Sequence, residues 1–181
     1  ASPQETIGEI DAIFRIEKDI FHLEYSYKFY LFDDKLEQPF INCWIGPNKN
    51  DSLSQKLKKL KDNQLPLLHH KITRQLLEQH DLHSKSIKQR IILKAQLFVP
   101  EDSMLISYNA INQDAIAGVH LNLNQLIKYS SCKFFIPTKH NWLIPPQENV
   151  NWISFDLIYP KILNFHKKQL SPMVWIKFYS G

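Results

Sequence analysis

Apolar and polar positions at the start of the chain follow the pattern of a β-hairpin. Residues 7–16 and 20–32 are rich in aromatic and β-branched side chains, which strands favour, and a polar break at 17–19 separates them. The segment 33–50 carries turn-forming residues and a Trp-Ile-Gly-Pro-Asn run, so we expect mostly loop there.

A helix is predicted after this loop, with Asp51 or Ser52 as its N-cap. Residues at helical spacing form one largely apolar stripe, which comprises Leu53, Leu57, Leu60 and Gln64. The remaining surface of the helix carries four lysines, Lys56, Lys58, Lys59 and Lys61. Pro66 interrupts the pattern, and a second helix is predicted over residues 67–80.

Residues 88–99 alternate in the manner of a strand. One predicted face holds Arg90, Ile92, Lys94, Gln96 and Phe98. The other face, expected to be buried, holds Ile91, Leu93, Ala95, Leu97 and Val99. In the last third the predicted elements are a short helix over 121–129, a strand over 132–136, a helix over 156–170 and a strand over 173–179.

The size and composition fit one globular domain covering residues 1–181, with a core over about 5–100 and a C-terminal elaboration over about 101–181. The net charge of +4 permits a polyanionic partner without requiring one. No apolar stretch approaches a membrane span, and two isolated cysteines suit a reducing cytoplasm. Because the chain does not begin with Met, we expect an N-terminal segment to be missing.

The predicted hairpin gathers acidic side chains. Glu9 and Asp11 are two residues apart and would share one face of the first strand. Glu24, Ser26 and Lys28 would share one face of the second. If the strands pair with these faces in agreement, three carboxylates and one amine converge, and a hard divalent cation such as Mg²⁺ would balance them.

Spacing alone leaves two readings of this cluster. The first is a ladder of salt bridges across the hairpin, which is common in antiparallel sheets. The second is a metal site, in which the ion polarises a phosphoryl oxygen and activates water while a lysine holds the phosphate.

The run Gly8-Glu9-Ile10-Asp11, followed after thirteen residues by Glu24, resembles the Gly-Glu-Ile-Asp … Glu-X-Lys arrangement of the PD-(D/E)XK nuclease superfamily. The stretches GEIDAIF, HLEYSYKFYL, CWIGPNKNDSLSQKLKKLKDNQLPL, IILKAQLFVP and NWLIPP are similar to domain-of-unknown-function family 1853, a bacterial family placed among such folds. The resemblance implies an α/β, restriction-endonuclease-like fold, in which a mixed central sheet of about four or five strands is flanked by helices.

The resemblance also implies a function. It suggests a Mg²⁺- or Mn²⁺-dependent deoxyribonuclease acting on DNA phosphodiesters, with Asp11 and Glu24 as metal ligands and Glu9 as the accessory acid. Lys28 would hold the phosphate or orient the water. Candidate DNA contacts are Lys56, Lys59, Gln64 and Lys94, of which Lys56 and Gln64 match recurrent family positions. The alternative interpretation of the lysine-rich helix is a solvated face.

One departure from the family pattern supports alternatives. The superfamily lysine follows the Glu by two residues, whereas Lys28 follows Glu24 by four, about 6.6–7 Å farther along the strand. A nuclease-fold module that binds nucleic acid or a protein partner without cutting is therefore the second reading. A third is an assembly component or homo-oligomer that uses the aromatic-rich C-terminal tail, comprising Trp142, Trp152, Trp175, Phe178 and Tyr179.

Other cofactor classes lack sequence support. Dinucleotide-binding, kinase and serine-hydrolase signatures are absent, so no nucleotide cofactor is expected. The remaining histidine clusters are interpreted as surface residues, because their spacing does not suit zinc; they are His69, His70, His80 and His83.

Overall fold

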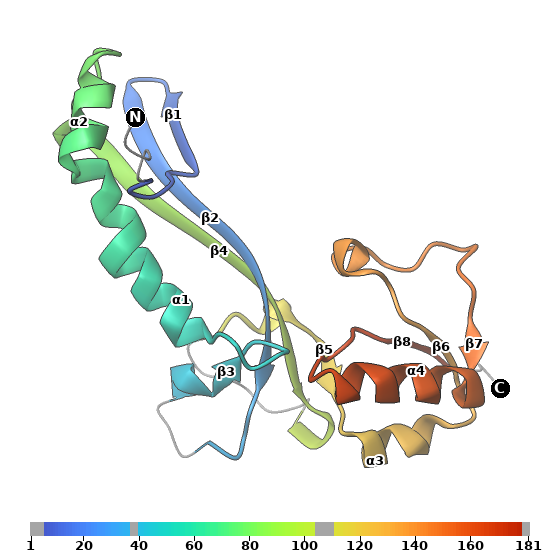
Figure 1. The fold of residues 1–181 in the computed structure, drawn as a ribbon. Coiled ribbons are helices and arrows are strands. Elements are labelled where there is room, and N and C mark those ends of the chain that lie inside the picture. Colours follow the sequence, from blue (N-terminus) through green and yellow to red (C-terminus); the bar gives the residue numbers. More distant parts are fainter. Residues whose placement is uncertain (1–5, 37–39, 104–110, 179–181) are drawn as a thin grey trace, which may run out of the picture.

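The protein is a mixed α/β structure with two sheets (Figure 1). The computed structural model describes residues 6–36, 40–103 and 111–178. The central five-stranded sheet contains β1 (Ala12–Ile16), β2 (Asp19–Phe32), β3 (Trp44–Ile45), β4 (Ile87–Pro100) and β5 (Ile116–His120). The smaller sheet contains β6 (Lys133–Phe135), β7 (Ile153–Ser154) and β8 (Trp175–Lys177). The α-helices are α1 (Leu53–Lys59), α2 (Lys71–Glu78), α3 (Leu123–Leu126) and α4 (Phe155–Lys167).

The predicted hairpin is confirmed, but its first strand is shorter than expected. β1 and β2 pair antiparallel from Ala12 opposite Leu23 to Ile16 opposite Asp19. Residues 7–11 lie outside the strand, so the expectation of a strand over 7–16 was wrong at its start. The carboxylate of Asp11 accepts the backbone N–H of Tyr25 at 2.7 Å. That N–H is therefore already satisfied by a side chain, and the ladder of backbone hydrogen bonds ends there.

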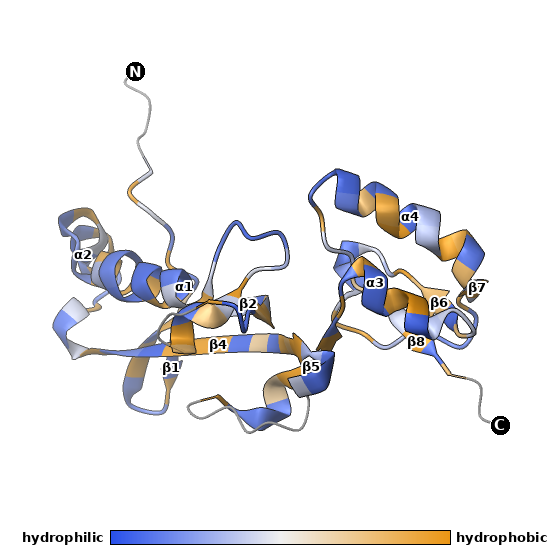
Figure 2. Cartoon of the chain, turned by 90° about the horizontal axis from the view of Figure 1, so that it is seen from below, coloured by the Kyte–Doolittle hydropathy of each residue, from blue (hydrophilic) through white to orange (hydrophobic). Residues whose placement is uncertain are grey.

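β2 and β4 form the long parallel centre of the sheet. The strand predicted over 88–99 is confirmed as β4, and it runs beside β2 from Ile20 opposite Ile87 to Leu31 opposite Phe98. Apolar and polar residues follow one another along the strand in short blocks, which appear as colour bands in Figure 2. The face expected to be buried is buried at Leu97 and Val99.

That face is not buried throughout, because Ile91 is 42% exposed. β5 pairs with β4 only beyond Leu97, so the middle of β4 is a free edge of the described sheet. Alternation in the sequence marks the two faces of a strand, but it does not show where neighbouring strands stop.

The connection from β2 to β4 carries α1 and α2 on one side of the sheet (Figure 1). Ser52 caps α1, and its hydroxyl accepts the N–H of Gln55 at 3.2 Å, as the sequence predicts. The second helix, predicted over 67–80, is divided in two: a 3-10 turn at Leu65–His69 and α2 are separated by His70, whose backbone is extended. The short helix, the strand and the long helix expected after residue 120 are present as α3, β6 and α4.

The predicted inner stripe of α1 was partly wrong. Leu53 and Leu60 are buried, but Leu57 is 39% exposed and Lys56 is half-buried in its place. After Lys59 the helix continues as a π-helical turn, Leu60–Gln64. The turn inserts extra backbone, so residues beyond it rotate around the axis relative to a regular α-helix. The sequence offers no simple signal for such a turn.

The helix-covered face of the sheet holds two separate apolar clusters. One comprises Tyr30, Trp44, Leu53, Leu97 and Val99. The other, at the far end of the sheet, comprises Leu68, Leu77 and Ile87. The Trp44 segment was expected to cap the core, and its indole is fully buried. Between the two clusters, β2 places polar side chains under the helices.

The smaller sheet has a cluster of its own, formed by Leu126, Cys132, Phe134, Ile158 and Ile162. β8 is confirmed as the final strand, although Tyr179 lies outside the described residues. Within the described part of the chain, no helix has the length and apolar character that a membrane crossing needs.

Candidate functional site

Glu24 is a carboxylate held in the middle of the helix-covered sheet face. It lies on β2, its side chain has no exposed surface, and both of its oxygens accept hydrogen bonds. Oε1 is 2.7 Å from Nε2 of His22, and Oε2 accepts Nε2 of Gln64 at 2.8 Å. A buried charge is costly unless it is hydrogen-bonded, and these two contacts supply that compensation.

The histidine beside Glu24 has a defined proton arrangement. His22 is also fully buried, and its Nδ1 lies 3.0 Å from Nε2 of Gln89. The same amide nitrogen donates to the carbonyl of Leu65 at 2.7 Å, which fixes the orientation of the Gln89 amide because a carbonyl only accepts. Nδ1 of His22 must then accept, so Nε2 carries the proton and donates to Glu24.

Gln64 supplies the second donor to Glu24. Its Oε1 accepts the ammonium of Lys56 at 3.0 Å, which leaves Nε2 to face the carboxylate. Gln64 reaches β2 from the π-helical turn, a feature that recurs at functional sites. Glu24 is therefore the common end of two hydrogen-bond chains, one from Gln89 through His22 and one from Lys56 through Gln64.

Asp11 stands next to this network. The pairing of β1 with β2 ends at Ala12 opposite Leu23, so Asp11 and Glu24 are the next residues beyond the last pair. The sequence spacing predicts that the two acids meet on one face, and it placed Asp11 inside a strand, whereas the structure places it just ahead of β1. Asp11 is exposed, and one of its oxygens accepts the Tyr25 N–H.

Lys56 responds to both acids and to its lysine neighbours. Its pKa is lowered by burial first and then by the positive charges of Lys28 and Lys59. Asp11 and Glu24 act on the same pKa in the opposite direction. Two carboxylates and two further amines are therefore close enough to Lys56 to act on its pKa.

The remaining predicted site residues have different surroundings. Lys28 shares the face of Glu24, but its ammonium pairs with Asp51 at 2.9 Å. Lys59 is exposed on α1, and Glu9 is exposed ahead of β1. Lys94 is opposite Tyr27 and lies on the other face of the sheet, so the structure does not bring it to Glu24.

Asp11 and Glu24 would offer a hard cation only two protein ligands. Mg²⁺ is often held by one or two carboxylates while water and substrate phosphates complete its shell, and Asp11 with Glu24 fits that description. Among the described residues, no group of three or more His, Cys, Asp or Glu side chains gathers as a metal site. An ion at this position would therefore keep most of its ligands as water or substrate oxygens.

Sequence reasoning missed His22 and Gln89. It named Lys56 and Gln64 as candidate DNA contacts, and the structure joins these two side chains by a hydrogen bond of 3.0 Å. A signal for His22 exists, because it precedes Glu24 by two residues and must share its face. Gln89 offers a weaker signal, since its contact depends on the parallel register of β4. The histidines interpreted as surface residues are exposed, namely His69, His70, His80 and His83.

Comparison with known proteins gives one match. Neither the curated proteins nor the solved structures include a match to this chain. The sequence model of one family, described as Domain of unknown function (DUF1853), matches residues 2–175. That match covers nearly the whole chain and all of the residues around Glu24, so the protein belongs to the DUF1853 family.

Proposed function

We propose that this protein is a nuclease-like, Mg²⁺-dependent deoxyribonuclease of the PD-(D/E)XK type, in which Asp11 and Glu24 hold the metal. The observation that supports the proposal is that Glu24 is held in a buried hydrogen-bond network, and that Glu24 and Asp11 both act on the pKa of Lys56 from the covering helix. Mn²⁺ is the natural substitute ion, because it accepts the same oxygen ligands.

The proposal gives each side chain a task. A bound Mg²⁺ would polarise the scissile phosphoryl group and lower the pKa of an attacking water. Gln64 and His22 hold the Glu24 carboxylate in one orientation by donating to its two oxygens. Lys56 is half-buried beside the acids, where its ammonium can contact a phosphate oxygen, a stronger interaction there than in bulk water.

Two lysines and one acid take supporting tasks. Lys59 extends the positive charge of α1 along a DNA backbone, and Lys28 does the same from β2 when it exchanges Asp51 for a phosphate. Glu9 lies just ahead of Asp11 and supports the metal through water. A cytoplasmic location accompanies the proposal, since Cys43 and Cys132 are both free thiols.

Cleavage assays on plasmid, linear and branched DNA, with Mg²⁺ or Mn²⁺, test the proposal. We expect Asp11→Ala to reduce the cleavage rate about a hundredfold or more, in line with the loss of a transition-state charge stabiliser. Lys56→Met should also slow cleavage strongly. The matched control is Lys58→Met on the same helix, because the side chain of Lys58 is 79% exposed.

The proposal fails if no substrate is cut with either ion, or if Asp11→Ala cuts as fast as the wild type. Equal losses in Lys56→Met and Lys58→Met would reject the assigned place of Lys56, because they would reflect only the net charge of α1. Thermal melting of each variant separates lost chemistry from lost folding.

A second candidate is a nuclease-fold module that binds nucleic acid without cutting it. It is favoured by the ion pair between Lys28 and Asp51 and by the complete burial of Glu24. A divalent-ion titration of DNA binding distinguishes the two. Binding that is unchanged by EDTA, together with no cleavage, supports the module, whereas ion-dependent binding and cutting support the nuclease.

A further inference from the structure

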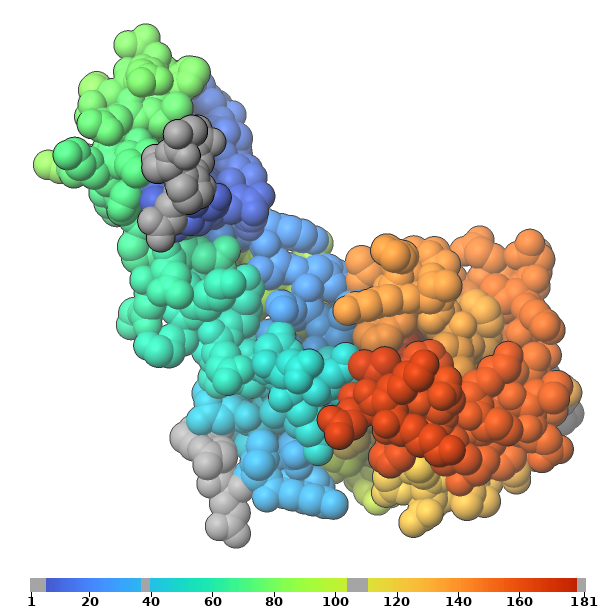
Figure 3. Space-filling view, viewed as in Figure 1, coloured from blue at the N-terminus to red at the C-terminus, as the bar shows by residue number. Residues whose placement is uncertain are grey.

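The sheet face opposite Glu24 carries aromatic and basic side chains in register. Alternation along β2 places Phe21, Tyr25, Tyr27 and Phe29 on this face. β4 places Lys88, Arg90, Ile92 and Lys94 beside them. α1 and α2 lie on the other side of the sheet (Figure 1), and the space-filling view shows a notch between this part of β2 and the C-terminal lobe (Figure 3).

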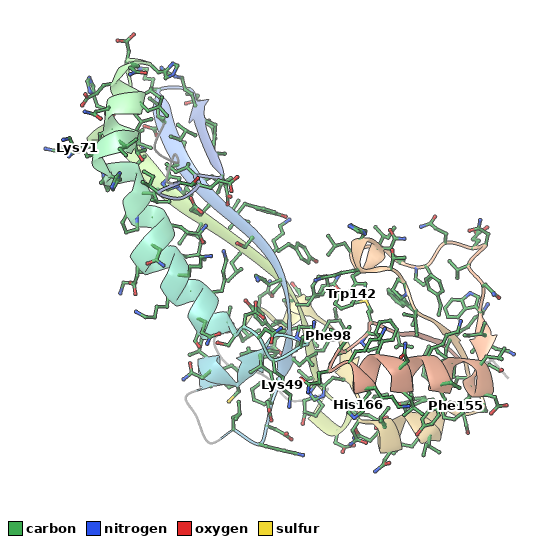
Figure 4. The ribbon with its side chains drawn as sticks, in the orientation of Figure 1. Lys49, Lys71, Phe98, Trp142, Phe155 and His166 are labelled. Carbon is green, nitrogen blue, oxygen red and sulfur yellow. The ribbon has the colours of Figure 1, made fainter. Side chains whose placement is uncertain are left out.

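Of these four rings only Tyr25 is exposed; the other three are half-buried, and Phe21 stacks on Phe14 with ring centroids 5.5 Å apart. Tyr25 is 48% exposed, and Ile92 opposite it is 41% exposed. From Phe21 to Phe29 the column extends over about 26 Å, given a rise near 3.3 Å per residue. Phe29 ends the column against Trp142 of the C-terminal lobe, with ring centroids 5.1 Å apart, and Figure 4 shows that tryptophan beside the sheet.

The charges on this face are mainly positive. Arg90 lies over the Phe21 ring at 5.5 Å, and Lys88 lies over the same ring while pairing with Asp19. Asp19 is the one acid that the register places on this face within the described strands β1, β2 and β4. Lys94, opposite Tyr27, is exposed. Arg90 and Lys94 thus flank the column of rings with positive charge that is available to phosphates.

We propose that this face binds single-stranded nucleic acid, with bases stacked on Tyr25 and its neighbour Tyr27 and the phosphate backbone following Arg90 and Lys94 on β4. Stacking platforms beside basic side chains are the common physical basis of single-strand binding. A duplex fits poorly, because its bases are already paired and stacked and cannot offer their faces to Tyr25 and Tyr27.

This site is separate from the acids proposed to hold metal, because residues on the two faces of a strand point in opposite directions. It therefore goes beyond the proposed nuclease function and does not need that function to be correct. The proposal also assigns a phosphate contact to Lys94, which lies on the sheet face opposite Glu24.

Fluorescence anisotropy of the 181-residue chain in EDTA tests the site without any cleavage. The probes are a labelled oligothymidylate, an oligouridylate and a duplex of equal length. We expect the single strands to bind more tightly than the duplex, and the two single-stranded probes show whether DNA or RNA is preferred. Tyr25→Ala should weaken single-strand binding about five- to a hundredfold, whereas Tyr25→Phe should keep it.

A matched charge pair separates a local contact from net charge. Lys94→Gln should weaken binding and reduce the salt slope by about 0.7 for one lost phosphate contact. Lys71→Gln should leave both unchanged, because Lys71 is an exposed residue of α2 and points away from the sheet (Figure 4). The proposal is overturned by absent binding, by a duplex that binds as tightly, by an unaffected Tyr25→Ala variant that melts normally, or by equal effects of the two lysine changes.

Discussion

The orientation of the Glu24 carboxylate is set by two hydrogen-bond donors, His22 and Gln64. Each oxygen of its buried carboxylate meets one donor, and each donor is oriented by a further contact. A low-dielectric interior strengthens such a network and makes any mismatch within it expensive. The arrangement therefore fixes the direction of the carboxylate.

Replacing Glu24 with Gln should destabilise the protein although the shape is nearly unchanged. The new amide would turn its NH₂ toward either His22 or Gln64, both of which already donate. His22 cannot change tautomer to compensate, because Nδ1 faces the amide of Gln89. We expect a loss of about 1–3 kcal/mol in the free energy of unfolding, measured by urea denaturation.

The control for this change is Glu78→Gln, since Glu78 is exposed on α2. It should alter the free energy of unfolding by no more than about 0.5 kcal/mol. A Glu24→Gln variant as stable as this control would show that the directional network does not restrain the carboxylate.

At the residue scale, the sequence predicts the pairing of the hairpin better than the choice of amines. The register of a hairpin follows from alternation and from a short turn, and the pairing of β1 with β2 ends at Ala12 opposite Leu23, next to Asp11 and Glu24. Lys56 replaces Leu57 on the inner side of its helix, and only the three-dimensional backbone shows this. Lys28 was chosen from its spacing on the strand, but it forms an ion pair with Asp51, which lies 23 residues later in the chain.

The helix segment between β2 and β4 is the element that completes the site. α1 supplies Lys56, and the π-helical turn Leu60–Gln64 directs Gln64 toward β2. Both positions depend on where the helix begins, because a shift of one residue would rotate the inner stripe by about 100°. The start of α1 was predictable from its capping residue, whereas its end at Lys59 and the π-helical turn were not.

Ser52→Ala should weaken this element through the loss of its N-cap. The Ser52 hydroxyl accepts the Gln55 N–H, and removing such a contact costs about 0.5–2 kcal/mol in the free energy of unfolding. Ser52→Asp should restore stability, because aspartate caps equally well and suits a helix N-terminus. Chemical denaturation of the three proteins checks this, and a Ser52→Asp variant as unstable as Ser52→Ala would contradict it.

The whole molecule joins a sheet that carries the site to a C-terminal lobe with a core of its own. Contacts between the two include Phe29 with Trp142 and the hydroxyl of Ser171, which donates to the carbonyl of Pro47. Tyr129 donates a hydrogen bond to Glu101, just beyond β4, and Lys128 pairs with the same carboxylate. The sequence predicted most elements of this lobe, but it carried no information on these long-range contacts.

The Tyr129 contact gives the junction a defined pH dependence. The hydrogen bond to Glu101, together with burial, raises the pKa of Tyr129 to about 12. Since the folded-state pKa lies above the ordinary value near 10, the stabilising contribution is complete below about pH 10 and is lost as pH rises toward 12. The stability difference between wild type and Tyr129→Phe should therefore shrink across that window.

Unfolding curves recorded at several alkaline pH values measure that difference, and tyrosinate absorbance follows the ionisation itself. A stability difference that is constant from neutral pH to pH 12 would contradict the contact between the two lobes.

The central claim is that Asp11 and Glu24 together hold a divalent ion. The most direct measurement is a crystal structure of the protein soaked with Mn²⁺, with anomalous scattering used to locate the ion. We predict an anomalous peak between the carboxylates of Asp11 and Glu24 that disappears in Asp11→Ala. A well-ordered site with no peak at saturating Mn²⁺, or a peak elsewhere that Asp11→Ala leaves unchanged, would contradict the account.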